Sequence, residues 1–521
     1  MKTDSIQMLI TMCIYIMVVI GIGIYYAKKS NQNSENFFIG GRSLGPWVAA
    51  MSAEASDMSG WLLMGLPGVA YWCGLADAFW TALGLALGTY FNWLIVSKRL
   101  RKYSYVAGNA ITIPDFFSNR FKENKKIIMT IASLFILIFF SVYAGSCFVT
   151  CGKLFKEMFG GDYQLMMLLG ALFVISYTFL GGFLAESVSD FMQAILMIFS
   201  LVIILIVGVG AAGGIDAVVA NIKDIPGFIE FFGMADPVLD ESGKQLVVSG
   251  VPQFNTTAKD YSILSAVSML AWGLGYFGMP QVLLRFIAIR KADELKRSRR
   301  IATIWCVISL AAAVCIGIIG RSAYPDALLT KADAESIFVH MSGILLHPLF
   351  AGVVMAGILA ATISSSDSYL LIASSAISKN LYQGVIKKNA TDKQVMFVSR
   401  VTLLLVALVG IIIALDENSV IFGIVSFAWA GFGATFGPLM ILSLFWKRIN
   451  RAGAIAGMLS GGISVFVWKL LLNPLGGVFA IYELLPAFII SCIFIFVVSL
   501  LTKEPSDEIK AEFEKAKTIE C

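Results

Sequence analysis

Long apolar runs recur along nearly the whole chain, and their length predicts helices that cross a membrane. A helix of about 20 apolar residues spans the roughly 30 Å hydrocarbon core of a bilayer. We predict about thirteen such spans from the runs. The ninth is too long for one crossing, so we expect an extra helix or a bend at one of its ends. The ranges are 6–26, 46–72, 75–97, 127–155, 163–183, 188–212, 262–287, 302–322, 337–380, 396–415, 419–446, 452–472 and 480–502.

The composition agrees with a polytopic membrane protein. Hydrophobic residues make up 58% of the 521 positions and charged residues only 14%, whereas soluble domains carry about 25% charged residues. The net charge of +5 is explained by basic loops, so it does not indicate a nucleic-acid partner. The first span has no small-residue cleavage signature, and we expect a retained helix and not a signal peptide. No segment outside the spans is long enough for a separate catalytic domain.

The distribution of Lys and Arg predicts the orientation of the chain. Basic residues gather after odd-numbered spans, as in "KRLRK" at 98–102 and "RKADELKRSRR" at 290–300, whereas the long segment 213–261 after the sixth span is mildly acidic. Cytoplasmic loops carry the excess of Lys and Arg. We therefore expect the N-terminus outside and the C-terminus in the cytoplasm of a bacterial cell, with the protein in the plasma membrane.

Three spans depart from plain apolar helix. The second contains "SAEASDMSGWLLMGLPG", the seventh "WGLGYFGMPQ" and the ninth "AATISSSDSYL". Gly and Pro within two separate spans indicate the discontinuous helices of a secondary transporter. Freed carbonyls and Ser hydroxyls are oxygen ligands that suit a hard cation such as Na⁺, whereas His and Cys would indicate a transition metal. The polar, bent stretches therefore predict a site where an ion and a solute bind together.

Less specific interpretations apply to single residues of these spans. A lone Gly most often allows close helix packing, and Ser commonly bonds back to the preceding turn. The carboxylates of Asp57 and Asp367 are harder to explain in this way, because a charge at the bilayer centre costs at least about 2.5 kcal/mol. Glu54 and Asp190 carry less weight, since either could lie near an interface. Trp272 and Tyr276 share one helix face and suggest the wall of a binding pocket.

The strings "GGRSLG", "ASDMSGWLLMGLPG", "FLGGFLAESVSDFMQ", "WGLGYFGMPQVLLRFIAIR" and "ILAATISSSDSYLL" resemble the sodium:solute symporter family over nearly all the chain. The resemblance is strongest to members that carry proline. It implies an all-α fold of the leucine-transporter-like class, in which two inverted five-helix repeats form the core and the first helix of each repeat is broken. The expected divisions are 1–45 (first span and inner loop), 46–212 and 262–446 (the repeats), 213–261 (extracellular loop), 447–502 (last two spans) and 503–521 (a charged cytoplasmic tail that can form a helix).

The resemblance also implies which residues bind the ion and the solute. It implies sodium ligands at the carbonyls of Ala55, Met58 and Ala361 and the hydroxyls of Ser364 and Ser365. Asp57 is expected to support sodium binding or coupling, and Arg42 coupling and the inner gate. The expected proline pocket is Ser59, Trp61, Tyr143, Trp272, Tyr276 and Pro280. A second sodium site, present in some family members, would correspond to Asp190, Asp367 and Ser368.

The expected activity is sodium-coupled import of proline, with Na⁺ as the coupling ion, no other cofactor and no enzymatic activity. Gln281 follows Pro280 where some proline carriers have His, so alanine, glycine, pantothenate or a short carboxylate stay open as solutes. A membrane sensor is the alternative from another class, although no kinase-like C-terminal segment is present in the sequence. Neither the charged rings of a channel nor an enzyme's nucleophile with its base is found. The oligomeric state is left open.

Overall fold

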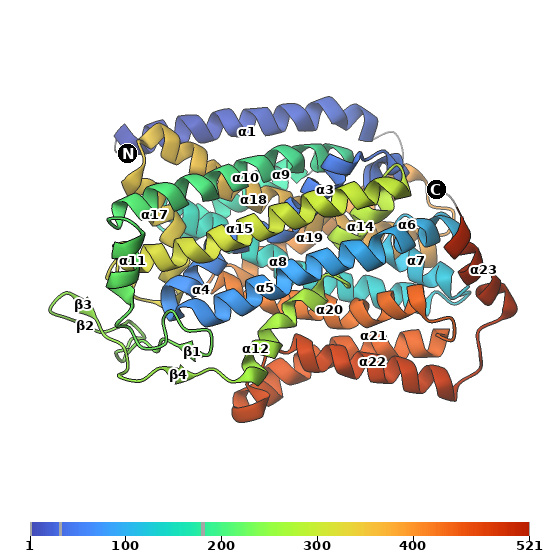
Figure 1. Ribbon diagram of the computed structural model, residues 1–521. Helices are drawn as coiled ribbons and strands as arrows, with labels where there is room; N and C mark the ends of the chain where they lie inside the picture. Colours follow the sequence, from blue (N-terminus) through green and yellow to red (C-terminus); the bar gives the residue numbers. More distant parts are fainter. Residues whose placement is uncertain (1–2, 31–33, 179–182, 520–521) are drawn as a thin grey trace.

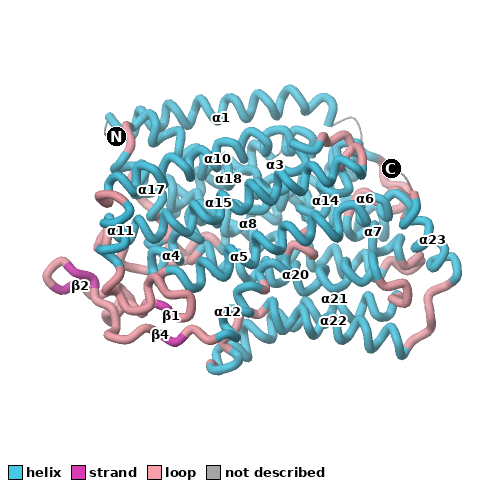
Figure 2. Tube along the Cα trace, viewed as in Figure 1, coloured by secondary structure: helices cyan, strands magenta, loops and turns pink. Residues whose placement is uncertain are grey.

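The computed structural model describes residues 3–30, 34–178 and 183–519, and nearly all of the elements in them are helices (Figure 1, Figure 2). Residues 179–182, which include the "GG" near the end of the predicted fifth span, lie outside the described residues. The helices are α1 Thr3–Ser30, α2 Ser34–Ile39, α3 Pro46–Gly60, α4 Leu66–Cys73, α5 Leu75–Phe91, α6 Ser97–Val106, α7 Ile113–Arg120, α8 Ile127–Phe159, α9 Tyr163–Thr178, α10 Phe183–Ala211, α11 Ile215–Ile222, α12 Ile263–Leu270, α13 Trp272–Gly275, α14 Pro280–Ala288, α15 Leu295–Ala323, α16 Lys331–Ala334, α17 Ile337–Leu345, α18 Pro348–Ser375, α19 Asp392–Ile413, α20 Ile421–Phe445, α21 Arg451–Val467, α22 Leu484–Leu501 and α23 Asp507–Thr518.

All thirteen predicted ranges fall on helices, but not all of them are long single spans. Within the described residues, eleven helices are long and apolar enough to cross a membrane. The predicted fifth span is represented there by the shorter apolar helix Tyr163–Ser176. The predicted second span is α3, a wider π-helical turn Trp61–Gly65 and α4. The predicted ninth span divides into α17 and α18, and Pro348 begins α18, where a missing N–H does no harm. The expected extra helix at one end of that span is thus confirmed.

The core helices pack in a symmetrical pattern. α4 packs on α15 in the way that α12 and α13 pack on α5, and α10 packs on α18 in the way that α20 packs on α8. In the predicted repeats 46–212 and 262–446, helices at equivalent positions therefore make equivalent contacts with the other repeat. Two structurally related repeats would pack in this way. α1 lies outside this core against α10 and α18, and α21 and α22 lie at the opposite edge against α20 (Figure 1).

The segment 213–261 forms a cap over one end of the bundle. It contains α11 and four two-residue strands, β1 Gly233–Met234, β2 Val247–Val248, β3 Val251–Pro252 and β4 Lys259–Asp260. β1 pairs antiparallel with β4, and β2 with β3. The sequence prediction of an all-helical chain missed these strands, because each is too short to produce an alternating pattern. The cap is held close to the α4–α5 turn, where a Cβ on Gly74 would lie 2.3 Å from the Phe228 carbonyl oxygen.

The charged tail forms α23, so the expectation of a helical tail is confirmed. Phe513 is buried against the side of α6, with the guanidinium carbons of Arg99 and Arg120 at 5.0 and 5.4 Å from the centre of its ring. Lys122 pairs with Glu512 on the same helix, and the hydrogen bond to this carboxylate raises the pKa of Lys122. The tail is thereby attached to the loop between the predicted third and fourth spans.

Candidate functional site

The first broken helix is interrupted at Ser59. This residue has φ 50° and ψ −169°, which is not helical, and its Oγ accepts the N–H of Trp61 at 3.2 Å. The next residue must be small, since a Cβ on Gly60 would lie 2.4 Å from the Thr150 methyl carbon. The predicted break in the second span is therefore confirmed, and it exposes backbone groups that a regular helix would pair.

The second broken helix is interrupted between α13 and α14. Met279 has φ −74° and ψ 110°, which is extended, and Pro280 then begins α14. The glycines before it allow close packing on α20, because a Cβ on Gly275 would lie 1.9 Å from Trp429 Nε1 and one on Gly278 would lie 2.3 Å from the Phe432 carbonyl. Both interpretations of a membrane glycine therefore apply here: the glycines allow close helix packing, and they lie beside a break in the helix.

Buried oxygen atoms converge where α3 meets α18. Ser364 Oγ lies 2.9 Å from the Ala55 carbonyl oxygen and 3.1 Å from that of Ala361, and Ser365 Oγ lies 3.3 Å from the Ala55 oxygen. Met58, the remaining predicted ligand, is buried one turn farther along α3, and its carbonyl accepts the N–H of Trp61. Ala55, Ala361, Ser364 and Ser365 thus meet in space, whereas the Met58 carbonyl pairs with the N–H of Trp61. The predicted donor set is made entirely of neutral oxygens.

The Asp57 side chain reaches the second broken helix. It is 3% exposed, and its Oδ1 accepts from Gln281 Nε2 at 3.3 Å. The Tyr143 hydroxyl lies 3.4 Å from the Asp57 carbonyl oxygen. Glu54 is buried on the same helix, and its Oε1 lies 3.4 Å from Trp93 Nε1. Asp57 therefore bridges the two breaks.

Aromatic rings fill the space between the two breaks. The Trp61 and Trp272 ring centres lie 5.3 Å apart, Tyr276 meets Trp429 edge to face at 5.1 Å, and Tyr143 stacks on Tyr369 at 4.2 Å. The sequence interpretation missed the partners from other spans, which are Tyr369, Phe422, Trp429 and Tyr482. Phe422, Trp429 and Tyr482 stand in ordinary apolar or turn contexts, so no local signal distinguishes them, whereas Tyr369 belongs to the polar stretch "AATISSSDSYL" of the ninth span.

The indole nitrogens at the centre of this aromatic cluster have no partner. Trp61 and Trp272 are 3% and 1% exposed, and neither Nε1 has a hydrogen-bond acceptor among the described residues. Buried indole N–H groups usually find an acceptor. The two indole rings that contact each other therefore each carry an N–H donor without an acceptor.

Two of the predicted residues lie away from this centre. Pro280 lines a narrow space of about 10 Å³ with Ile136, Leu284 and other apolar side chains, which holds at most about one water. Arg42 lies near the start of α3, where it donates to the carbonyls of Ile287 at 2.8 Å and Ala110 at 2.9 Å. Both residues lie on the side of the breaks that is closed by packed loops.

The residues of the predicted second sodium site divide into two groups. Asp367 accepts a hydrogen bond from Thr178 at the end of α9. Asp190 and Ser368 instead bind Arg285, with their oxygens at 3.2 and 2.9 Å from its Nη2. Sequence interpretation did not single out Arg285, although an arginine inside the apolar string "VLLRFIA" is the kind of intramembrane charge that indicates function.

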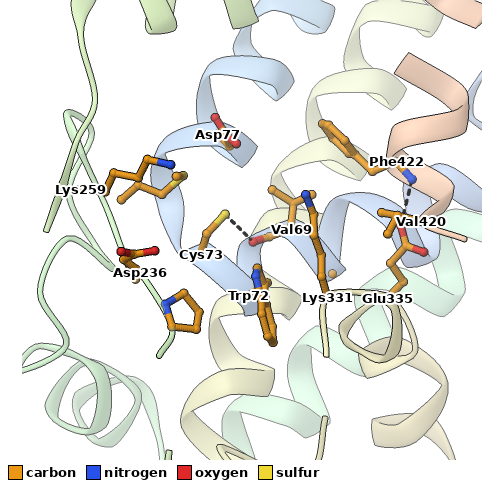
Figure 3. Close-up of a pocket in the computed structure, with 14 residues that line it drawn as sticks. Val69, Trp72, Cys73, Asp77, Asp236, Lys259, Lys331, Glu335, Val420 and Phe422 are labelled. Atoms are coloured by element: carbon orange, nitrogen blue, oxygen red, sulfur yellow. Dashed lines mark hydrogen bonds between the residues drawn. The ribbon is translucent and has the colours of Figure 1, made fainter. Parts of the chain in front are cut away.

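On the other side of the breaks, a cavity of about 220 Å³ lies under the cap (Figure 3). Phe422, which packs on Trp61 and Trp272, forms part of its wall. Glu335 holds the start of α20 there, accepting the N–H groups of Ile421 at 2.8 Å and Phe422 at 2.9 Å. The other charged residues that line the cavity are Asp77, Asp236, Lys259 and Lys331. The cavity therefore reaches the aromatic cluster at Phe422, from the cap side.

Comparison with known proteins agrees with this geometry. The sodium:solute symporter family model matches residues 37–461. A sodium/proline symporter 2 of Staphylococcus saprophyticus is 40% identical, covering 99% of this chain and 97% of the relative, and a sodium/proline symporter of Staphylococcus aureus is 38% identical, covering 98% and 96%.

Among solved structures, a sodium-coupled sialic acid symporter in a substrate-bound outward-open state matches with a TM-score of 0.74 and 18% identity, covering 96% of this chain and 99% of that one. Mhp1, a nucleobase-cation-symport-1 family transporter, matches with a TM-score of 0.53 and 12% identity, covering 93% and 100%. The predicted leucine-transporter-like, all-α class is confirmed by these neighbours, apart from the short strands of the cap. The chain belongs to the sodium:solute symporter family.

Proposed function

We propose that this protein imports proline into the cell together with Na⁺, by exposing one central site alternately to each side of the membrane. Two features support the proposal: relatives named sodium/proline symporters match nearly the full length, and the two broken helices bring a set of oxygens and a set of aromatic rings together. The observation that carries the solute half is the pair of buried indole donors on Trp61 and Trp272 that lack acceptors.

In the ion half of the site, Na⁺ binds between α3 and α18. Its ligands are the carbonyls of Ala55, Met58 and Ala361 and the hydroxyls of Ser364 and Ser365. Neutral oxygens are the donors that hard cations prefer, and a bound ion would replace the contacts that the two hydroxyls now make with the Ala55 oxygen. One ion supplies enough energy: a 100 mV potential gives about 2.3 kcal/mol and a tenfold gradient about 1.4 kcal/mol, together a several hundred-fold accumulation.

In the solute half, the proline carboxylate accepts the indole N–H groups, and its ring lies against the aromatic faces. Ser59, Trp61, Tyr143, Trp272 and Tyr276 form this pocket, and Pro280 contributes by ending the second break. The rings of Trp61 and Trp272 now touch, so a solute has to separate them on entry. Phe422 lines the cavity under the cap, and a movement of its side chain would open a path from the cavity to the pocket.

We propose that the protein lies in the plasma membrane, with the cap outside the cell. In this orientation α23 and the loop that contains Arg42 face the cytoplasm. This orientation follows from the basic loops at the Arg42 end. The cavity then opens outward, while the hydrogen bonds of Arg42 to Ile287 and Ala110 close the inner side. Arg42 would have to release these carbonyls before the site can open inward.

The proposed solute is tested by a panel of radiolabelled amino acids in proteoliposomes with an inward sodium gradient. Unlabelled proline should compete at least about tenfold better than alanine or glycine. Their primary ammonium group carries one more N–H donor, which a pocket matched to proline leaves unpaired at roughly 1–3 kcal/mol. Vesicles with equal sodium on both sides are the control. Equal competition by all three would favour the more general small-solute carrier, and binding without sodium-driven uptake would favour a sensor.

Asp57 is proposed to couple the ion to the solute, because its side chain joins the two broken helices through Gln281. Asp57→Asn removes the negative charge that offsets the cation, and the sodium concentration for half-maximal uptake should rise by about tenfold, which is about 1.4 kcal/mol. Maximal proline binding at saturating sodium should change much less. An unchanged sodium titration would rule out this role.

The second sodium site at Asp190, Asp367 and Ser368 is also a proposal. Carboxylates outnumber cations in this region, which favours an additional ion, but two of the three residues bind Arg285 in this structure.

A further inference from the structure

One buried arginine joins four helices close to the proposed sodium ligands. Arg285 on α14 is fully buried. Its Nη2 pairs with Glu186 and lies 3.2 Å from Asp190 Oδ2 on the same helix, α10, and 2.9 Å from Ser368 Oγ on α18. Its Nε donates to Ser52 Oγ on α3 at 3.0 Å. A change at this one side chain therefore reaches both broken helices at once.

This cluster lies one helical turn from the proposed sodium ligands, on the side of Arg42. Ser52 precedes Ala55 by three residues on α3, and Ser368 follows Ser365 by three residues on α18. The two helices run in opposite directions, since Ala55 meets Ser365 while Ser52 and Ser368 meet through Arg285. In the proposed orientation, an ion leaving its site for the cytoplasm passes this cluster next.

The charges in the cluster are not balanced. Two carboxylates, those of Glu186 and Asp190, share the single guanidinium of Arg285, and all three side chains are almost completely buried. Glu186 Oε1 accepts both the guanidinium and the Ser368 hydroxyl. Asp190 Oδ1, by contrast, has no hydrogen-bond partner among the described residues. An unpaired carboxylate oxygen in a buried position attracts a cation, because its charge is otherwise uncompensated.

We propose that Glu186 is a positioning residue, which holds Arg285 as the gate on the cytoplasmic side of the sodium path. This inference rests on the proposed function. By taking the closest contact with the guanidinium, Glu186 leaves Asp190 Oδ1 available to the departing ion. Without the Glu186 charge, Arg285 pairs with Asp190 alone, and the ion loses the oxygen that draws it out of its site.

Glu186→Gln tests the gate. Gln keeps the size of the side chain and an oxygen for Ser368, and it leaves one guanidinium with one carboxylate, so no buried charge becomes unpaired. We expect the sodium concentration for half-maximal proline binding, measured at equilibrium in membranes, to stay within about twofold, while the maximal uptake rate in proteoliposomes falls by about tenfold. Glu186→Asp keeps the charge and should recover most of the rate.

The matched control is Glu512→Gln. Glu512 is also a largely buried carboxylate facing one cation, Lys122, but it lies on the tail helix α23, outside the repeats. This variant should match the unmodified protein in both measurements. A wild-type uptake rate in Glu186→Gln, or a loss of binding that parallels the loss of rate, would overturn the gate. If the unmodified protein shows no sodium-dependent proline binding, the proposed function fails instead, so the two failures are distinguishable.

Discussion

Ser364→Ala and Ser365→Ala are each expected to raise the sodium concentration for half-maximal proline uptake by about tenfold. Each change removes one neutral oxygen ligand from the proposed ion site, and a contact between a polar group and a charge contributes roughly 1.5–3 kcal/mol. A loss of about 1.4 kcal/mol already corresponds to a factor of ten. The hydroxyls lie 2.9 and 3.3 Å from the Ala55 carbonyl oxygen, so no other oxygen of the same helix takes their place without moving the backbone.

Ser366→Ala is the matched control for this result. Ser366 directly follows Ser365 and is equally buried, but its Oγ donates to the Thr362 carbonyl of its own helix. Its loss should leave the sodium titration unchanged. The measurement is initial uptake against external sodium at saturating proline. The site between α3 and α18 would be rejected if the two serine variants and the control gave the same titration.

The sequence alone was sufficient for the broken helices, because their signals are local. The clustering of Gly60, Gly65 and Pro67 in one span, and of Gly275, Gly278 and Pro280 in another, predicted where helical geometry ends, and the structure has non-helical residues at Ser59 and Met279. The direction of the chain relative to the membrane is likewise inferred from local loop charge, and it stays a prediction. These predictions need only neighbouring residues, and the physics behind them acts over a few positions.

The contacts between spans could not be predicted in this way. Nothing near Phe422 indicates that its ring would pack against Trp61 and Trp272, which lie far away in the sequence. Arg285 is visible as a charge in an apolar run, yet its partners Glu186 and Asp190 come from a helix of the other repeat. The predicted second sodium site placed Asp190 with Asp367 and Ser368 because the resemblance to the family implied it. In the structure Asp367 binds Thr178, and the guanidinium takes Asp190.

The ion and solute halves share the residues around the first break. The Asp57 carbonyl receives the Tyr143 hydroxyl, and its carboxylate reaches Gln281 on the second broken helix. Two residues earlier on α3, the carbonyl of Ala55 meets both serines of α18. Binding of Na⁺ at Ala55 would fix the same helical turn that presents Asp57 and Ser59 to the solute. Such shared ordering makes each ligand favour binding of the other, and the coupling is equal in both directions.

The selectivity for proline should depend on the aromatic rings between the breaks. Trp272→Ala and Tyr276→Ala are each expected to reduce the preference for proline over alanine from at least about tenfold to about threefold or less, since a truncated aromatic side chain loses the ring contact and the area that it buried. Trp272 carries one of the two indole donors without an acceptor, so its variant should also raise the proline concentration for half-maximal uptake. Tyr276→Ala should change selectivity more than sodium dependence.

Competition by unlabelled proline and alanine against labelled proline measures this preference directly. Trp468→Phe is the control, because Trp468 belongs to the last two spans and donates to the Phe479 carbonyl there. Both ring variants must still respond to sodium, which separates a changed pocket from a misfolded protein. Trp272 stacks on Tyr482 and its carbonyl accepts from Trp429 Nε1, so Trp272→Phe gives a milder test of the same ring. If Trp272→Ala and Tyr276→Ala kept the full preference for proline, the aromatic cluster would not be the solute pocket, and recognition would have to lie in the cavity under the cap.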